Sequence, residues 1–299
     1  MAEPVDGWLE RDGVSLHYVE WRPDGAAQRE PPLLLLHGLS SNARYWDRLA
    51  RNLPDRRIVA LDQRGHGLTG RPPQAPPTTG GYTMELLLED AMFVIGELGL
   101  YKPTVVGHSW GATVALELVG PRPALASALV FIDGPIQSAA NMFSWEDAQR
   151  FMQPPLPRFA KFADAMAQSA LDFNGAWSDD LEPFVKARVV PGGNAFVLTL
   201  TAGARLELLR GLYDSQPDVL WPRVEVAAVA LLARGGPDRI AGWKEQGAAR
   251  LAVSAPRVEV RWFETPHDIP LFAPAEVAAE IERVSATAAI GPGSESPTG

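Results

Sequence analysis

The chain of 299 residues is 46% hydrophobic and 21% charged, a composition that excludes disorder of the whole chain. Its 27 basic and 36 acidic residues give a formal net charge of −9, so nucleic acid, whose phosphates such a surface repels, is not an expected partner. The absence of cysteine excludes disulfides, thiolate metal sites and a cysteine nucleophile.

Short apolar runs alternate with helical patterns along most of the chain. A hairpin is predicted first, with strands at Gly7–Arg11 and Val14–Trp21 and a turn at residues 12–13. Later strands are predicted at Leu33–Leu36, Ile58–Leu61, Thr104–Val106, Ala128–Ile132, Val226–Ala233 and Val258–Phe263. Helices are predicted at Arg44–Leu53, Met84–Leu98, Ala112–Val119, Ile240–Leu251 and Pro274–Ala288. This alternation indicates an α/β fold, in which a mostly parallel sheet has helices on both faces.

One stretch, residues 135–216, breaks the alternation, because it carries helical patterns and prolines but no convincing strand. It directly follows a predicted strand, so we expect a helical cap, or lid, over the C-terminal ends of the strands, where open α/β sheets bind ligands. The expected organisation is a core of residues 1–134 and 217–289, this cap, and a disordered tail of residues 290–299, which are rich in Gly, Pro and Ser.

The segment GHSWG, residues 107–111, has the pattern G-x-S-x-G between a predicted strand and a predicted helix. That setting is typical of a nucleophile elbow, which projects a serine from a tight turn at the start of a helix. Ser109 is therefore the candidate nucleophile, and the backbone N–H of Trp110 is a candidate oxyanion donor. The second donor is expected after the strand at residues 33–36, at the N–H of Leu39. The alternative is a glycine-rich turn in which the serine only caps the helix.

A serine nucleophile needs a base, and His267 fits best among the five histidines, because it follows the last predicted strand at the sheet edge that carries Ser109. The orienting acid should follow another strand. Asp238 gives the chain order serine, acid, histidine and is preferred, while Asp133, which ends an earlier strand, is the alternative. On this preference, Asp238→Asn should lower turnover far more than Asp133→Asn.

The run GHGLTG, residues 65–70, also matches G-x-G-x-x-G, with Asp90 twenty residues beyond its last glycine. A dinucleotide site would need a helix to begin there, so that its N-terminus meets the pyrophosphate. Residues 71–73, Arg-Pro-Pro, break any such helix, so no dinucleotide is expected. The chain also lacks the H-E-x-x-H, Walker and calcium-loop patterns, so no metal or other cofactor is expected.

These motifs together resemble the α/β-hydrolase superfamily, and within it the small serine esterases that carry a lid. The resemblance rests on HGLSSNARYW, LDQRGHG, VGHSWGA, LLARGGPD and TPHDIPLFAPAEV, which fall in the right order and cover residues 8–134 and 220–288. It implies an eight-stranded, mostly parallel sheet and hydrolysis without a cofactor. Ala112 departs from the second glycine that relatives commonly carry there. Related haloalkane dehalogenases and epoxide hydrolases attack with an aspartate at the elbow, so Ser109 argues against both activities.

The cap is rich in aromatic and methionine side chains, some of which are expected to line an apolar pocket above Ser109. The candidates are Phe143, Trp145, Phe151, Met152, Phe159 and Phe162. The predicted function is a serine hydrolase, carboxylesterase-like, that cleaves a small to medium hydrophobic ester or lactone through an acyl-serine intermediate. The alternatives are a lactonase, a C–C bond hydrolase or a perhydrolase on the same triad, or a ligand receptor that retains a slow hydrolase fold.

The start of the chain has neither the basic nor the apolar region of a signal peptide. The longest apolar run, Val226–Ala233, is much shorter than the ~20 residues that span a bilayer. We therefore expect a cytoplasmic protein with no membrane partner.

Overall fold

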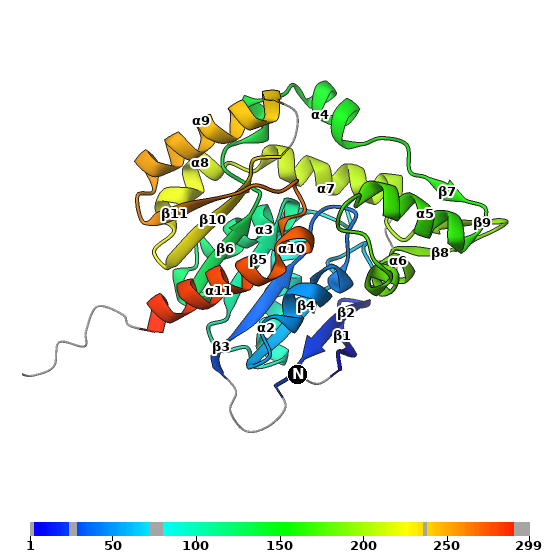
Figure 1. The fold of residues 1–299 in the computed structure, drawn as a ribbon, viewed down its shortest axis with the longest axis horizontal. Helices are drawn as coiled ribbons and strands as arrows, with labels where there is room; N and C mark the ends of the chain where they lie inside the picture. The colour runs from blue at the N-terminus through cyan, green and yellow to red at the C-terminus, as the bar shows by residue number, and fades with distance from the viewer. Residues whose placement is uncertain (1–2, 24–28, 72–79, 236–237, 290–299) are drawn as a thin grey trace, which may run out of the picture.

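The computed structural model describes residues 3–23, 29–71, 80–235 and 238–289 (Figure 1). The predicted C-terminal tail, residues 290–299, lies outside the described residues. None of the helices in the described ranges is both long enough and apolar enough to cross a membrane.

The strands form one eight-stranded sheet in the order β1-β2-β4-β3-β5-β6-β10-β11. They are β1 (Val5–Arg11), β2 (Val14–Trp21), β3 (Arg29–Leu36), β4 (Arg56–Leu61), β5 (Thr104–His108), β6 (Ala128–Ile132), β10 (Ala227–Ala233) and β11 (Val258–Phe263). The pairs β1–β2 and β2–β4 are antiparallel, and all the other pairs are parallel. The predicted α/β fold, its N-terminal hairpin and its mostly parallel eight-stranded sheet are therefore confirmed.

Helices cover both faces of this sheet (Figure 1). They are α1 (Asp47–Arg51), α2 (Met84–Glu97), α3 (Trp110–Val119), α8 (Pro217–Leu220), α9 (Asp238–Ser254), α10 (Ile269–Phe272) and α11 (Pro274–Ala289), with 3-10 turns η1 (Ala43–Trp46), η2 (Pro123–Leu125) and η5 (Trp221–Arg223). Side chains alternate across β3, so Leu34 and Leu36 pack with α2 and α3, whereas Leu33 and Leu35 pack with α1 and α11. All four leucines are fully buried, as strands covered on both faces require.

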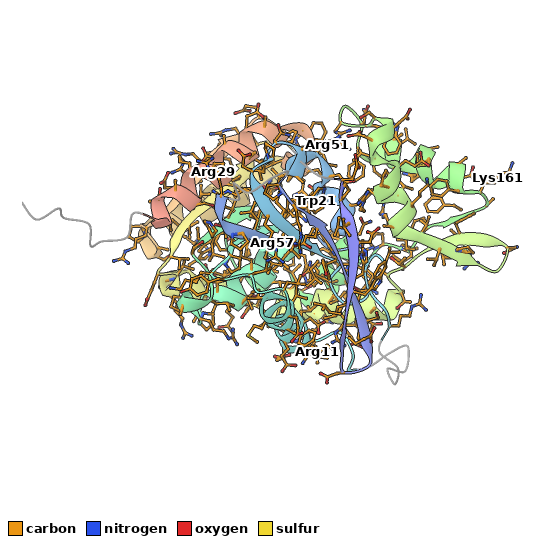
Figure 2. All side chains as sticks on the ribbon, turned by 90° about the horizontal axis from the view of Figure 1, so that it is seen from below. Arg11, Trp21, Arg29, Arg51, Arg57 and Lys161 are labelled. Atoms are coloured by element: carbon orange, nitrogen blue, oxygen red, sulfur yellow. The ribbon has the colours of Figure 1, made fainter. Side chains whose placement is uncertain are left out.

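The segment between β6 and β10 includes a lobe at one end of the molecule, formed by residues 158–198 (Figure 1), and Lys161 marks the outer end of that lobe (Figure 2). Its helices are α4 (Trp145–Met152), α5 (Phe162–Asp172), α6 (Glu182–Arg188) and α7 (Ala202–Asp214), with 3-10 turns η3 (Ala139–Asn141) and η4 (Asp179–Leu181). The expectation that residues 135–216 hold no strand was wrong. A small antiparallel sheet joins β7 (Arg158–Phe159), β9 (Ala195–Leu198) and β8 (Val189–Gly192). These strands are only two to four residues long, too short for an alternating pattern to show.

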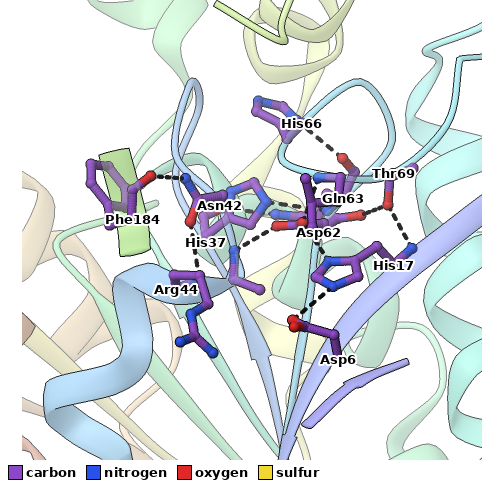
Figure 3. Close-up of polar contacts among 12 residues, drawn as sticks. Asp6, His17, His37, Asn42, Arg44, Asp62, Gln63, His66, Thr69 and Phe184 are labelled. Carbon is purple, nitrogen blue, oxygen red and sulfur yellow. Dashed lines mark hydrogen bonds and ion pairs between the residues drawn. The ribbon is translucent and has the colours of Figure 1, made fainter. Parts of the chain in front are cut away.

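The glycine-rich run at residues 65–70 folds around the buried carboxylate of Asp62 (Figure 3). Asp62 Oδ2 accepts from Nδ1 of His17 at 2.6 Å and from the N–H of Leu68 at 2.7 Å, while Oδ1 accepts from the N–H of Ala43 at 2.6 Å. A Cβ atom on Gly67, which has a φ of +52°, would lie only 2.0 Å from Asp62 Oδ2. The run therefore serves a turn around a carboxylate, and no helix begins within it.

Candidate active site

Ser109 occupies a strained turn between β5 and α3. Its φ of 53° and ψ of −118° lie in a region that residues with a side chain rarely adopt. The flanking glycines are required by space: a Cβ on Gly107 would lie 2.4 Å from the carbonyl oxygen of Gly111, and one on Gly111 would lie 2.2 Å from that of Leu36. The local sequence thus produces the geometry of a nucleophile elbow.

The end of β6 lies directly beside this elbow. The N–H of Ser109 donates to the carbonyl oxygen of Ile132 at 2.8 Å, and a Cβ on Gly134 would lie 3.0 Å from the carbonyl oxygen of Ser109. Asp133, between them, has a φ of 50°, which turns the chain sharply as it leaves the strand. Its carboxylate is therefore held close to the elbow.

His267 and Asp133 form a close pair at this sheet edge. Nδ1 of His267 lies 2.5 Å from Asp133 Oδ2, and because a carboxylate only accepts, Nδ1 carries the proton and Nε2 is left free. The Asp133 side chain is fully buried, whereas that of His267 is 50% exposed. The imidazole is thus fixed from the interior and open to a substrate on its other side.

The structure brings the alternative acid, Asp133, to His267, in place of the preferred Asp238. Asp238 is the first residue of α9, and its side chain lies outside the described part of the structure. The contact with Nδ1 of His267 that the orienting acid should make is made by Asp133.

Lys244 is a third member of this cluster, and sequence reasoning missed it. From α9, its Nζ donates to Asp133 Oδ2 at 2.7 Å and to the carbonyl oxygen of Ala233 at 2.9 Å. The N–H of Ala233 in turn donates to Asp133 Oδ1 at 2.9 Å. Both carboxylate oxygens are therefore held in place, and one ammonium and one imidazole share Oδ2.

These contacts set the protonation states of the pair. Burial acts to raise the pKa of Asp133, but the hydrogen bond to His267 and the charges of His267 and Lys244 lower it below its usual value. For His267, desolvation acts to lower the pKa, but the hydrogen bond to Asp133 and its charge raise it above the usual value. Lys244 opposes this rise, because its positive charge disfavours a second cation nearby.

His108 and Tyr45 support the loop that carries His267. The buried His108 ring donates from Nε2 to the carbonyl oxygen of His267 at 3.1 Å, and the two rings lie 4.8 Å apart. Burial, and then the charge of His267, lowers the pKa of His108 to about 4, so it is neutral at pH 7. Tyr45 stacks on His108 at 4.9 Å and donates to Asp268 Oδ1 at 3.2 Å. His267 is thus anchored both to Asp133 and to the residue that precedes Ser109.

The two candidate oxyanion donors flank Ser109. Trp110 is the first residue of α3, and the loop of Leu39 touches the serine, since a Cβ on Gly38 would lie 3.4 Å from Ser109 Cβ. Among the described residues, no protein acceptor takes the backbone N–H of Leu39 or of Trp110. His37 holds this loop in place: Nδ1 donates to the carbonyl oxygen of Gly38 at 2.8 Å, and Nε2 accepts from the N–H of Gln63 at 3.1 Å.

The six pocket candidates separate into two groups within the cap. Phe143 packs edge-on against Trp243 of α9 at 4.9 Å, and Trp145 packs against Tyr213 of α7 at 5.2 Å. Phe159 and Phe162 join the side chain of Phe196 near the small sheet, in the cluster on the α1 and α11 side of the main sheet. Phe151 is half exposed, and the carbonyl oxygen of Met152 accepts from Arg205. Their contact with a substrate stays a prediction.

The described residues hold no group of three or more His, Cys, Asp or Glu side chains arranged to bind a metal ion. The polar groups at the site are those of acid–base and nucleophilic chemistry.

Comparison with known proteins agrees with this geometry. The family model for the alpha/beta hydrolase fold matches residues 31–176. The E-2-(acetamidomethylene)succinate hydrolase structure has a TM-score of 0.77 at 19% identity, covering 94% of this chain and 99% of that one. The thioesterase domain from the curacin biosynthetic pathway has a TM-score of 0.75 at 20% identity, covering 94% of this chain and 100% of that one. These likenesses show the fold, and over residues 31–176 the chain is similar to the alpha/beta hydrolase family.

Two curated relatives are similar over shorter stretches. Lipase LipV of Mycobacterium tuberculosis is 31% identical over 177 residues, which cover 59% of this chain and 61% of the lipase. Epoxide hydrolase 3 of Mus musculus is 34% identical over 138 residues, which cover 46% of this chain and 35% of that enzyme. The chain thus matches less than two thirds of the length of either relative.

Proposed function

We propose that the protein is a serine hydrolase that cleaves a carboxylic ester through an acyl-Ser109 intermediate. The observation that carries the proposal is a serine on a strained elbow next to a His267–Asp133 pair. His267 is held by His108, the residue before Ser109, and Asp133 is followed by Gly134, which packs against Ser109. A base held in one tautomer beside a serine is the arrangement that activates a hydroxyl nucleophile.

In the proposed reaction, Nε2 of His267 takes the Ser109 proton as Oγ attacks the ester carbonyl. The oxyanion that forms is held by the N–H groups of Leu39 and Trp110, which have no acceptor among the described residues. His267 then gives the proton to the leaving alcohol, and water releases the acid by the same steps in reverse. Asp133 holds the imidazole with Nε2 toward the serine and stabilises the imidazolium.

The names of the two relatives suggest two reactions, ester hydrolysis and epoxide hydrolysis, because one is a lipase and the other an epoxide hydrolase. The hydroxyl of Ser109 at the elbow favours acyl transfer. It supplies an alkoxide-type nucleophile activated by a histidine. Its tetrahedral adduct with an ester carbonyl expels the alcohol and leaves an acyl-serine ester that water can cleave.

A fluorophosphonate probe followed by an ester panel tests the proposal. We expect stoichiometric labelling of Ser109 and multiple turnover of phenyl esters by the unlabelled protein, with lactones and amides as comparison substrates. Labelling of another residue would contradict the assignment of the nucleophile. Labelling of Ser109 with at most one turnover would instead favour the receptor alternative.

Acyl-chain length should affect the rate if the cap roofs the site. Each buried methylene contributes about 0.8 kcal/mol, so kcat/KM should rise several-fold per carbon over short phenyl esters and stop when the pocket is full. The measurement is kcat/KM for uncharged esters from acetate to decanoate. A steady decline from acetate would exclude a medium-length apolar pocket, and gains out to the longest chain would indicate an open, lipase-like cleft.

Lys244→Met should shift the acidic limb of the pH–rate profile to higher pH. His267 must be neutral to accept a proton, so activity is lost as pH falls through its pKa, which Asp133 raises and Lys244 lowers. Without the ammonium the pKa of His267 should rise further, because a nearby positive charge no longer opposes the imidazolium. The measurement is kcat/KM for one ester from about pH 5 to 9.

Lys186→Met is the matched control, since Lys186 pairs with Glu182 on the surface of α6. Lys244→Arg should restore most of the wild-type profile because it keeps the charge. A limb that stays in place in Lys244→Met, or moves to lower pH, would contradict the role given to Lys244.

A further inference from the structure

Two arginines of the cap carry charge that no nearby carboxylate fully neutralises. Arg188, the last residue of α6, approaches Asp172 only to 3.9 Å, and its side chain is 22% exposed. Arg205, on α7, donates from Nη2 to the carbonyl oxygen of Met152 at 2.8 Å, which is a neutral partner. The Nε atoms of both side chains are buried and have no hydrogen-bond partner. A guanidinium removed from water in this way retains unused donors and an uncompensated charge.

Elsewhere in the described structure, buried arginines have close partners. Arg64 makes two hydrogen bonds to Asp90, at 2.7 and 2.8 Å, and Arg56 makes two to Glu282, both at 2.8 Å. These bidentate pairs are the usual way in which a protein compensates a buried guanidinium. Arg188 and Arg205 therefore lack the close, bidentate carboxylate partner that Arg56 and Arg64 have.

The two guanidinium groups share one region, and it adjoins the active site. The N–H of Thr199 donates to the carbonyl oxygen of Arg188, and the N–H of Arg205 donates to that of Thr201, both at 2.9 Å, so the short segment 199–201 joins the two residues. In keeping with this, burial and then the charge of Arg188 lower the pKa of Arg205. Arg188 experiences the charges of Asp172 and of Asp268, the residue after His267. Its guanidinium also lies 6.0 Å from the ring of Phe184, which in turn is 6.4 Å from that of Tyr45.

Arg205 approaches the opposite side of the site. Its charge contributes, after burial and the charge of His37, to the lowered pKa of His66. His66 lies against the candidate oxyanion site: its ring is 5.4 Å from that of Trp110, and its Nε2 accepts from the N–H of Ser40, the residue after Leu39. Leu200, on the segment between the two arginines, packs near Gly65, the residue before His66, since a Cβ on Gly65 would lie 3.4 Å from Leu200 Cδ1.

We propose that Arg188 and Arg205 together bind a carboxylate of the substrate, so that the enzyme acts on esters that carry a free carboxylate group. This inference rests on the proposed esterase function, whose substrate class it narrows. Two neighbouring arginines, each with an unused Nε–H donor, match the two oxygens of a carboxylate, and a partly dry surrounding strengthens that pairing. The predicted small to medium hydrophobic ester is narrowed accordingly to one that also carries a carboxylate.

Matched ester pairs test the proposal in the wild-type protein. Phenyl hydrogen adipate and suberate are compared with phenyl hexanoate and octanoate, and 4-(hexanoyloxy)butanoate is compared with butyl hexanoate. We expect kcat/KM at least about tenfold higher for the charged member of one set, which also tells whether the carboxylate lies on the acyl or the alcohol side. Equal or better use of the neutral members in both sets would overturn the proposal.

Arg188→Met and Arg205→Met give the second arm. Each should lower kcat/KM for the charged ester about tenfold or more, mainly through KM, and change the neutral ester less than about threefold. Arg210→Met is the control, because Arg210 lies on α7 too but is exposed and paired with Asp214 at 2.6 Å. Equal losses on charged and neutral esters would show a packing role only.

Binding of adipate and suberate to the Ser109→Ala protein, measured by calorimetry, separates this proposal from the proposed function. Binding that Arg188→Met or Arg205→Met abolishes would support the anion site even if no ester were hydrolysed. No binding by a protein that does hydrolyse neutral esters would overturn the anion site and leave the esterase function standing.

Discussion

Ser109→Ala should lower ester turnover by roughly 10⁴-fold or more, with the fold intact. In the proposed mechanism the hydroxyl forms the acyl-enzyme, and no other atom at the elbow can replace it. Alanine keeps the Cβ that the turn at φ 53° already accommodates, so the backbone strain is unchanged and the melting temperature should stay close to that of the wild type. The measurement is kcat/KM on a phenyl ester together with thermal unfolding.

Ser254→Ala serves as the control for this substitution, because Ser254 is exposed at the end of α9. The Ser109→Ala protein should also lose labelling by the fluorophosphonate probe. Turnover that persists within about tenfold of the wild type, from a protein purified free of other esterases, would exclude Ser109 as the nucleophile.

The sheet could be predicted because its strands carry strong local signals. Runs such as Leu33–Leu36 are apolar throughout, and in the structure all four side chains are buried between two layers of helices. The elbow could be predicted as well, because its turn requires glycine at two fixed positions. A Cβ on Gly107 or Gly111 would lie only 2.4 or 2.2 Å from backbone atoms. Each of these features occupies a few consecutive residues and therefore appears as a local pattern in the sequence.

The small sheet of the cap could not be predicted, for a physical reason. The central strand is β9. Its Phe196 and Val197 pair with Arg158–Phe159 of β7 on one side and with residues of β8 on the other. Segments of two to four residues, one of them containing Pro191, are stabilised by pairing rather than by an intrinsic pattern.

Contacts between distant segments determine which aspartate pairs with His267. Strands β6 and β10 are neighbours, so an aspartate after either one reaches the same edge of the sheet. The backbone turn at Asp133 and the contacts that Lys244 and Ala233 make with its carboxylate determine its direction. Lysine is rare in this chain, and that rarity was a signal that could have drawn attention to Lys244. Its partner, Asp133, lies 111 residues away, so no local pattern connects the two.

Asp133→Asn should lower turnover by roughly 10³- to 10⁴-fold, whereas Asp238→Asn should change it less than about tenfold. An amide at position 133 can donate to Nδ1 and so favours the imidazole tautomer with the proton on Nε2, which cannot accept the Ser109 proton. It also removes the charge that raises the pKa of His267 and that pairs with Lys244. The measurement is kcat on one phenyl ester near pH 8, with circular dichroism to verify the fold.

Asp238→Asn is the matched comparison, because both aspartates follow neighbouring strands of the sheet and only Asp133 contacts His267 in the described structure. Asp133→Glu, which keeps the charge but lengthens the side chain, should retain more activity than Asp133→Asn at high pH. If the two asparagine variants gave the reverse order, Asp238 would be the catalytic acid in solution. The Asp133–His267 contact would then describe a resting arrangement that must change before His267 can act as the base.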